Sequence, residues 1–359
     1  MAITTTGAIS FSDLRTEFVG GSSAISLGDL YRGGSNILKK AGDNTATNDA
    51  ASVPTSGAID MEDFYSTAKS FTKTYSSGAT DQTASTIFGD DYDVNYPKNI
   101  IINNGVELGA SSTSEEALEV PAGGVGTITV TNNGTLSGYG GAAGSVGGDA
   151  FESAVDCTFI NNGTVRAGGG GGGAGGTGGN GSYTSTSVLS YPLNRWISYQ
   201  TQGGPLNYYR QLAYVSNSLV YNAYNTYNSS YGSYSRSSYV QISYFNDPEY
   251  TVRYFRLAST STVSTSGGAG GAGGVGQGYN VSAGSGSSGA AGGTNAGTGG
   301  AGAAGGSFGN AGGTGSTGTN GNASNCAAGS AGGAAGKYAR QTAGTLTFTN
   351  NGTVQGNAP

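Results

Sequence analysis

The residues best suited to molecular recognition gather between Tyr183 and Tyr254. This segment holds 15 of the chain's 23 tyrosines and its one tryptophan, Trp196, interspersed with serine, asparagine and threonine. Aromatic rings present large rigid faces, and the small polar side chains supply adaptable hydrogen bonds. The composition therefore favours a surface that binds sugars or protein loops; an inserted β domain that packs its aromatic residues on itself is the alternative.

Ten residues of this segment are our candidates for direct contact with a ligand: Trp196, Tyr208, Tyr209, Tyr214, Tyr221, Tyr224, Tyr227, Tyr231, Tyr234 and Arg236. Arginines at positions 195, 210, 236, 253 and 256 give the segment positive charge in a chain whose net charge is −6. Such charge would suit an anionic polymer. Alternating residues from Tyr239 to Phe245 predict a β-strand.

Few residues in the chain are suited to catalysis. The chain has no histidine, which excludes a Ser-His-Asp triad, a Cys-His pair and histidine metal ligands. Within the tyrosine-rich segment only Asp247 and Glu249 could act as paired carboxylates, so a polysaccharide depolymerase is a minor alternative. Asp90, Asp91 and Asp93 could hold calcium or form a solvated loop. We expect no enzymatic activity, no cofactor and no metal site.

The recognition segment needs a scaffold, and the motif Asn-Asn-Gly indicates one. Its four copies have Asn103, Asn132, Asn161 and Asn350 as their first asparagines, and the first three follow at steps of 29 residues. Alternating apolar residues flank the motifs, as in strands with one buried face. We expect Asn-Gly to supply the positive φ of a tight turn between strands. The repeat predicts solenoid-like β rungs, stacked on one another.

Aligning the last three copies places their apolar residues in columns. The columns are Ile128/Cys157/Leu346, Val130/Phe159/Phe348 and Leu136/Val165/Val354. Cys157 stands where the other copies carry an aliphatic side chain, so we interpret it as a small buried hydrophobe and not as a reactive thiol. Cys157 and Cys326 form neither a CxxC pair nor a disulfide framework. The first copy, in which Val106 and Leu108 are offset by one residue, is interpreted as a cap.

Glycine accounts for 69 of the 359 residues and follows a period of three. One column runs through Gly267, Gly270, Gly273 and Gly276, and similar columns lie within 169–181 and 297–321. Three residues per turn is the period of the polyproline II helix, which has no internal hydrogen bonds. Because glycine lets neighbouring backbones approach, we expect a packed bundle with segment 168–181 in its interior. A flexible linker is the alternative.

The N-terminal segment contains a third repeat, which shares Ala-Ile-x-apolar-x-Asp-apolar among the copies Gly7–Arg15, Ser23–Tyr31 and Gly57–Tyr65. The pairs Ser10/Asp13, Ser26/Asp29 and Asp60/Asp63 predict capped starts of short helices. One or two helical turns are too short to stand alone, and we expect little shared core. We therefore predict an anchor on another subunit, and a local helical cluster is the alternative. The anchor residues are Phe11, Leu14, Phe18, Leu27, Leu30, Met61 and Phe64.

These patterns predict a mostly β chain of solenoid-like rungs, packed polyglycine helices of polyproline II type and short N-terminal helices. The expected parts are an N-terminal anchor (1–66), a connector (67–99), β rungs with the first glycine runs (100–182), a tyrosine-rich inserted domain (183–262), a glycine-rich bundle (263–340) and a closing rung (341–359). The sequence shows no apolar run long enough to span a membrane, no secretory signal and no basic patch for nucleic acid.

Taken together, these features resemble bacteriophage tail-fibre proteins. The opening GAISFSDLR, with ISLGDLYRGG after it, is similar to the N-terminal segments of tail and fibre proteins of marine myoviruses. The stretch from Val120 to Gly144 resembles the Asn-Asn-Gly and glycine-rich modules of the same proteins. Glycine runs alternating with a tyrosine-rich insert resemble the tip adhesins of T-even-like phages, in which packed polyglycine helices present receptor-binding loops.

The resemblance implies a non-enzymatic virion adhesin, assembled in the host cytoplasm as a homo-oligomer. Its N-terminal repeats would bind other tail or fibre subunits. Its tyrosine-rich insert would bind a host cell-surface polysaccharide or an outer-membrane protein. A purely structural fibre or sheath subunit is the alternative function.

Overall fold

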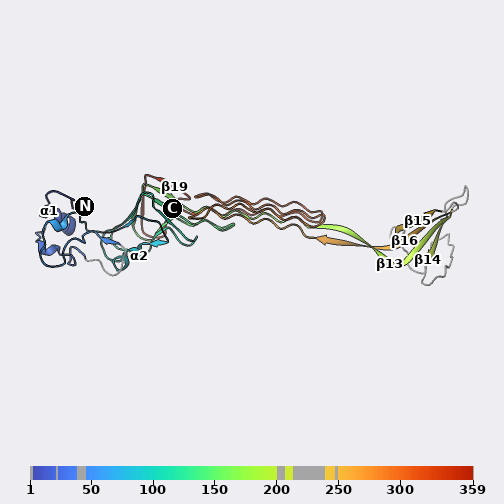
Figure 1. The fold of residues 1–359 in the computed structure, drawn as a ribbon, viewed down its shortest axis with the longest axis horizontal. Coiled ribbons are helices and arrows are strands. Elements are labelled where there is room, and N and C mark those ends of the chain that lie inside the picture. Colours follow the sequence, from blue (N-terminus) through green and yellow to red (C-terminus); the bar gives the residue numbers. More distant parts are fainter. Residues whose placement is uncertain are drawn as a thin grey trace. The chain divides into compact units, whose positions relative to one another are not determined.

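A computed structural model describes residues 3–21, 23–38, 46–199, 207–212, 239–246 and 250–358, with the backbone alone considered between 187 and 259. Strands predominate and the helices are short (Figure 1). The chain divides into two compact units: Met1–Asn180 with Ser266–Pro359, and Gly181–Thr265. No helix among the described residues is long and apolar enough to cross a membrane.

Stacked parallel strands form the centre of the first unit. One sheet has the order β1-β2-β5-β8-β11-β18, a second β19-β12-β9-β6-β3 and a third β17-β10-β7-β4. The first consists of β1 (Thr47–Asn48), β2 (Phe71–Tyr75), β5 (Lys98–Ile102), β8 (Ile128–Asn132), β11 (Cys157–Asn161) and β18 (Leu346–Asn350). All its pairings are parallel except that of β1 with β2.

The other two sheets take their strands from the same successive turns of chain. The second sheet consists of β3 (Ala79–Thr80), β6 (Glu107–Gly109), β9 (Thr135–Ser137), β12 (Thr164–Arg166) and β19 (Thr353–Gln355). The third consists of β4 (Gln82–Thr83), β7 (Leu118–Val120), β10 (Phe151–Ser153) and β17 (Arg340–Gln341). Each turn therefore lays its strands beside the equivalent strands of the turn before it.

The predicted apolar columns are confirmed by the strand register. Cys157 pairs with Ile128 on one side and Leu346 on the other, and the other two columns pair in the same way. Cys157 is buried within the core, as interpreted from the sequence. The Phe159 ring lies 4.4 Å from that of Phe151 and 5.2 Å from that of Phe348, centroid to centroid. Tilted and edge-to-face contacts between aromatic rings thus fill the core within and between turns.

One more turn of the stack lies before the first Asn-Asn-Gly motif, and the motif pattern did not reveal it. Strand β2 pairs in parallel with β5, β3 with β6 and β4 with β7, and α2 (Ala84–Phe88) with the 3₁₀ turn η4 (Gly89–Asp91) follows. The expected cap at Asn103 is therefore wrong, and part of the expected connector is a turn of the stack. Its sequence FTKTY buries Phe71 and Tyr75 but carries no Asn-Asn-Gly.

The Asn-Gly pairs do not act mainly as positive-φ turns, which corrects the expectation. Only Gly105 among the motif glycines has a positive φ, of 79°. At the other three, Gly134, Gly163 and Gly352, an added Cβ would overlap a carbonyl oxygen of the adjacent turn. Glycine is needed there because the backbones of successive turns approach closely.

The asparagines form two ladders that run along the stack. In the inner one, Asn132 Nδ2 donates to Asn161 Oδ1 at 2.8 Å, and Asn161 Nδ2 donates to Asn350 Oδ1 at 2.7 Å. The outer, exposed ladder joins Asn133, Asn162 and Asn351 at 3.0 Å per step. The motif therefore serves mainly to satisfy polar groups between turns.

Residues 167–339 leave the stack after β12 and return at β17, and their glycine segments run side by side (Figure 1). The backbone N–H groups of 169, 172, 175 and 178 donate to the segment 268–277, and those of 170, 173, 176 and 179 donate to the segment 310–319. Segments 297–306 and 327–336 donate back to the same central segment. Segment 168–179 is thus hydrogen-bonded on several sides, as expected for an interior position.

The glycine columns face neighbouring backbones, as the sequence predicts. A Cβ added to Gly267, Gly270, Gly273 or Gly276 would overlap the carbonyl oxygen of Gly178, Gly175, Gly172 or Gly169 respectively. Val275, which lies off this column, is 43% exposed. The period of three therefore keeps one side of the segment free of side chains, so that backbone can meet backbone.

The N-terminal residues form a core of their own. The helical elements are α1 (Phe11–Leu14), the π-type turn η1 (Arg15–Val19) and the 3₁₀ turns η2 (Leu27–Leu30) and η3 (Glu62–Phe64). Their buried side chains share one cluster with Ile37, Ala50 and Val53. The expectation of little shared core is wrong, because loop residues between the repeats complete the cluster.

The second unit is an antiparallel sheet with the order β14-β13-β16-β15. Its strands are β13 (Gly181–Tyr199), β14 (Asn207–Leu212), β15 (Tyr239–Asn246) and β16 (Tyr250–Thr265). The strand predicted from Tyr239 to Phe245 is confirmed as β15.

Candidate functional site

Each of the three N-terminal repeats folds into a short helical turn, and the first two are closed by a capping box. Ser10 N donates to Asp13 Oδ2 at 2.8 Å, and Asp13 N donates to Ser10 Oγ at 3.2 Å. Ser10 Oγ also donates to Asp13 Oδ2 at 2.7 Å, and this bond, together with that from Ser10 N, holds the pKa of the Asp13 carboxyl below its usual 3.8. The corresponding pairs in the other copies are Ser26–Asp29 and Asp60–Asp63. The first two predicted helix starts are therefore confirmed as capping boxes, whereas in the third copy Asp60 N donates to Asp63 Oδ2 at 2.9 Å but the 3₁₀ turn begins only at Glu62, after Met61.

Tyrosines link the repeats to one another. Tyr31, at the end of the second copy, donates its hydroxyl to the carbonyl of Gly57, which begins the third. Tyr65, at the end of the third copy, donates to the carbonyl of Gly7, which begins the first, at 2.5 Å. The third copy is thus hydrogen-bonded to both of the others, and Arg15 takes the equivalent position in the first copy.

The predicted anchor residues divide between the core and the surface. Leu14, Phe18, Leu30 and Phe64 are buried in the shared cluster, Leu27 and Met61 are half-buried against it, and Phe11 is 46% exposed. One residue from each repeat, Ile9, Ile25 and Ile59, is also half-buried against the cluster. Equivalent positions thus leave apolar surface accessible in all three copies.

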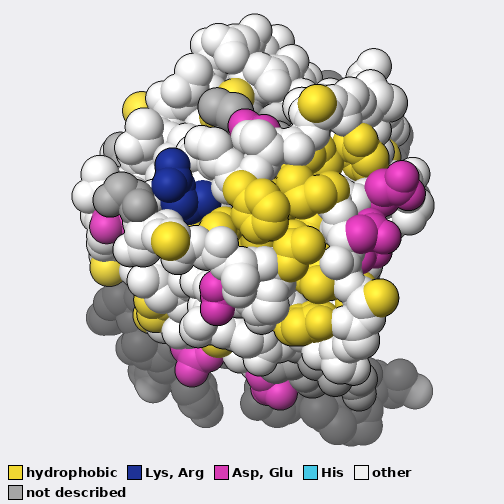
Figure 2. All heavy atoms as spheres, turned by 90° about the vertical axis from the view of Figure 1, so that its left-hand side faces the viewer, with side chains coloured by type: hydrophobic (Ala, Val, Ile, Leu, Met, Phe, Trp, Pro, Cys, Tyr) yellow, Lys and Arg dark blue, Asp and Glu magenta, His cyan; other side chains and the backbone are white. Residues whose placement is uncertain are grey.

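Figure 2 views the end of the first unit at which α1 lies, and hydrophobic side chains gather there in one patch. Few charged side chains interrupt it, although acidic and basic groups lie at its margins. We call the accessible apolar residues of the three repeats the docking patch. They are Ile9, Phe11, Ile25, Leu27, Ile59 and Met61. An apolar patch with a polar margin is typical of a protein interface.

Three of the ten candidate contact residues lie on described strands. Trp196 lies on β13, and Tyr208 and Tyr209 lie on β14. Ser198 of β13 pairs with Tyr208, and Ile197 pairs with Tyr209. The other candidates lie outside the described residues: Tyr214, Tyr221, Tyr224, Tyr227, Tyr231, Tyr234 and Arg236. Asp247 and Glu249, the carboxylates of the depolymerase alternative, lie outside them as well.

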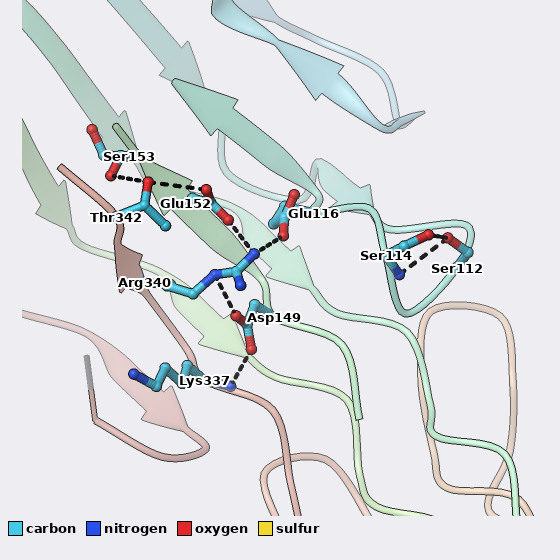
Figure 3. Close-up of polar contacts among 9 residues, drawn as sticks. All are labelled: Ser112, Ser114, Glu116, Asp149, Glu152, Ser153, Lys337, Arg340 and Thr342. Carbon is cyan, nitrogen blue, oxygen red and sulfur yellow. Dashed lines mark hydrogen bonds and ion pairs between the residues drawn. The ribbon is translucent and has the colours of Figure 1, made fainter. Parts of the chain in front are cut away.

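A charged cluster that sequence reasoning missed lies where the glycine segments return to the stack (Figure 3). Arg340 on β17 forms ion pairs with Glu116 at 2.7 Å, Asp149 at 2.9 Å and Glu152. Asp149 Oδ1 also accepts from Lys337 N at 2.6 Å. Arg340 and Glu152 are paired across β17 and β10, although 188 residues separate them in sequence. No local sequence signal could have joined residues so far apart.

The surroundings of Glu116 oppose its ionisation. Burial, followed by the nearby Glu152 carboxylate, raises the pKa of Glu116 to about 7, although Arg340 acts in the opposite direction. Burial likewise raises the pKa of Glu119 on β7. The cluster is thus a structural junction that carries more acidic groups than its single arginine neutralises.

The acidic run 90–93 lies near a buried cation. Lys98 Nζ donates to the carbonyls of Val94 at 2.6 Å, Val125 at 2.7 Å and Tyr96 at 3.1 Å. Burial lowers the pKa of Lys98, and the charges of Asp91 and Asp93 oppose that shift. Among the described residues, no group of three or more acidic or cysteine side chains is arranged to hold a metal ion. Asp91 and Asp93 thus help to keep a buried ammonium charged.

The family model described as "Phage tail fibre adhesin Gp38" matches residues 66–231 of this chain. The match confirms the resemblance to phage tail-fibre adhesins. It covers the stacked turns from β2 to β12, the central glycine segment 168–179 and residues 183–231 of the tyrosine-rich segment. The comparisons with curated proteins and with solved structures returned no match.

Proposed function

We propose that the protein is a non-enzymatic, receptor-binding adhesin of a phage tail fibre, carried on the virion. The observation that carries the proposal is the adhesin-family match over residues 66–231. Within this proposal the tyrosine-rich segment 183–262 binds a polysaccharide or an outer-membrane protein of the host. Its aromatic, amide and guanidinium groups support that role, because the rest of the chain consists mostly of scaffold residues.

The scaffold in this proposal has two rigid parts. The stacked turns act as a β-solenoid, and the glycine segments act as packed polyproline II helices. The parallel register between equivalent residues supports the first assignment, and hydrogen bonds repeated every three residues support the second. A rigid scaffold lowers the entropic cost of presenting binding residues.

The docking patch is proposed to attach the chain to another tail or fibre subunit. Its residues come from equivalent positions of three repeats, of which the third is hydrogen-bonded to both of the others. A partner that ends in three equivalent chains would offer three equivalent contacts to such a surface. One adhesin would then cap one trimeric fibre end, while any homo-oligomer would form through other surfaces.

Attachment can be tested with Phe11→Ser combined with Leu27→Ser. Phe11 is 46% exposed and Leu27 is half-buried, so neither change empties the centre of the core. We expect the variant to fold and to be lost from purified virions. Val146→Ser is the matched control, because Val146 is 56% exposed and lies outside the repeats. Equal incorporation of both variants would contradict the docking proposal.

Receptor binding can be tested by replacing Tyr221, Tyr224, Tyr227 and Tyr231 together by serine. An aromatic contact contributes about 1 kcal/mol, so single changes would reduce binding only several-fold. The combined change should reduce adsorption to host cells by orders of magnitude and leave the circular dichroism of the scaffold unchanged. Normal adsorption by the folded variant would make the segment structural.

Two alternatives have their own tests. A purely structural fibre or sheath subunit would bury the tyrosine-rich segment between subunits, which electron microscopy of the particle would reveal. A depolymerase would release new reducing ends from host polysaccharide, and Asp247→Asn would abolish that release. Adsorption without release of reducing ends supports the adhesin.

A further inference from the structure

The antiparallel sheet of the second unit brings cationic and aromatic residues into one row. Trp196 on β13 pairs with Arg210 on β14 and with Arg253 on β16, and Arg253 pairs with Tyr244 on β15. We call these four residues the Trp196 row. Adjacent strands lie about 5 Å apart, so the backbones of Arg210 and Arg253 lie about 10 Å apart with Trp196 between them.

The two faces of this sheet carry different residues. Residues paired directly across strands share a face, and successive residues of a strand lie on opposite faces. Tyr208, two positions from Arg210, therefore shares the face of the Trp196 row. The next row along, Tyr209, Ile197, Val252 and Phe245, belongs to the other face and is largely apolar. The row on the other side, Gln211, Arg195, Tyr254 and Ser243, also belongs to the opposite face, so both faces carry cationic and aromatic residues. The face of the Trp196 row differs in having a tryptophan flanked by two arginines.

We propose that the face of the Trp196 row binds an anionic saccharide, an inference that rests on the proposed receptor-binding function and names its ligand class. An indole ring provides an apolar platform for the face of a sugar ring. A guanidinium matches a carboxylate or a phosphate with two parallel hydrogen bonds. Arginines on both sides of one tryptophan therefore suit a sugar chain that carries repeated negative charge.

The net charge of the chain favours the arginine-bearing rows of this sheet as places where an anion would bind, and only in the Trp196 row do two arginines flank the tryptophan. The protein carries 21 acidic and 15 basic residues, so most of its surface repels anions. An anionic ligand would therefore be directed to the few places where arginines outnumber carboxylates. The Trp196 row is such a place, because its four residues include two arginines and no acidic residue.

The sheet offers a matched pair of variants with the same change in charge. Arg210→Gln with Arg253→Gln removes both cations of the Trp196 row. Arg195→Gln with Arg256→Gln removes two cations from the opposite face, since Arg195 is adjacent to Trp196 and Arg256 lies three positions from Arg253. The full chain would be titrated with hyaluronan oligosaccharides, with phosphorylated lipopolysaccharide core oligosaccharides and with neutral dextran.

We expect the parent to bind at least one anionic probe and not dextran, more weakly at high salt. Binding should fall about tenfold or more in the Arg210/Arg253 variant and stay nearly unchanged in the Arg195/Arg256 variant. The probe that binds identifies carboxylate or phosphate as the anionic group. Trp196→Ala should weaken binding with little change in its salt dependence, because the indole carries no charge.

Three results would overturn the inference: no binding of either anionic probe, equal loss in both double variants, or equal binding of dextran. Adsorption of the parent to host cells separates this failure from failure of the proposed function. If the parent adsorbs to cells but binds neither anionic probe, the ligand class is wrong and a protein receptor is favoured. If the parent adsorbs to no cell that the phage infects, the adhesin function itself fails.

Discussion

Gly273→Ala tests whether the glycine columns hold the scaffold together. A Cβ on Gly273 would overlap the carbonyl oxygen of Gly172, which lies on the central glycine segment. Beside this point, Gly172 N donates to Gly274 O at 2.8 Å. A methyl group therefore cannot be accommodated unless the two segments separate and this hydrogen bond lengthens or breaks.

The expected loss of stability follows from these two effects. Forcing an additional group into a packed site costs about 1–3 kcal/mol. Leaving a buried backbone donor and acceptor unpaired costs about 1–3 kcal/mol more. We therefore expect Gly273→Ala to lower the free energy of unfolding by about 2–6 kcal/mol, a large share of the total for a domain, and Gly273→Val to lower it further.

Gly313→Ala is the matched control, because its added Cβ would meet Ala303 Cβ at 3.1 Å and a carbonyl only at 3.6 Å. Both substitutions restrict the unfolded chain equally, so the comparison isolates the clash in the folded state. Urea denaturation would give the stabilities, and hydrogen exchange of residues 168–179 would report local opening. Equal stability and equal protection in the two variants would refute the packed-bundle reasoning. Val275→Thr, at a 43% exposed position, should also be tolerated.

Three other perturbations follow from the same geometry. Asn161→Ala should cost about 1–3 kcal/mol in a urea melt, because it takes the acceptor Asn161 Oδ1 away from the buried Asn132 Nδ2. Asn162→Ala in the exposed ladder should cost less than about 1 kcal/mol, and similar losses would contradict a role for burial. Burial raises the pKa of Glu116 to about 7 from 4.5, so the folded state retains a proton that the unfolded state releases. The stability that Glu116 contributes is therefore fully present below pH 4.5 and is lost as the pH rises through 7. Glu116→Gln should flatten this pH dependence, which urea midpoints measured between pH 4.5 and 7 would show. An unchanged dependence of the midpoint on pH would contradict the raised pKa of Glu116. Burial raises the pKa of the Cys157 thiol to about 12, so iodoacetamide should modify the partly exposed Cys326 first in the native protein. Mass spectrometry would measure the two rates of modification, and equal rates would argue against the burial of Cys157.

The features predictable from sequence are those in which one residue type recurs at a fixed interval. The columns through Cys157 and Phe159 follow from aligning three copies of one motif, and strand pairing reproduces them. The three-residue period of glycine predicts which side of each segment carries no side chains, because a Cβ added there would overlap a neighbouring backbone. The capping pairs Ser10–Asp13 and Ser26–Asp29 are local, so four adjacent residues suffice to predict them.

The features that escaped prediction depend on residues distant in sequence or on repeats that have lost their motif. Strand β2 has the buried face of a stacked turn but no Asn-Asn-Gly to mark it. The contacts of Arg340 join a returning segment to strands formed more than 180 residues earlier. The role of the Asn ladders was misjudged because Asn-Gly is also typical of tight turns, and only the register between turns distinguishes the two uses.

The scaffold explains how the chain can carry an insert of variable length, which under the proposed function is the receptor-binding segment. The chain leaves the first unit at Asn180 and re-enters it at Ser266. These two points are held beside each other, because Gly178 N donates to Gly268 O at 2.8 Å and Gly267 N donates to Asn180 Oδ1 at 3.2 Å. On the inserted side, Gly181 pairs with Thr265. Since the ends are already closed by these bonds, lengthening the insert adds little loop-closure cost, and recognition residues can change without altering the register of the glycine segments.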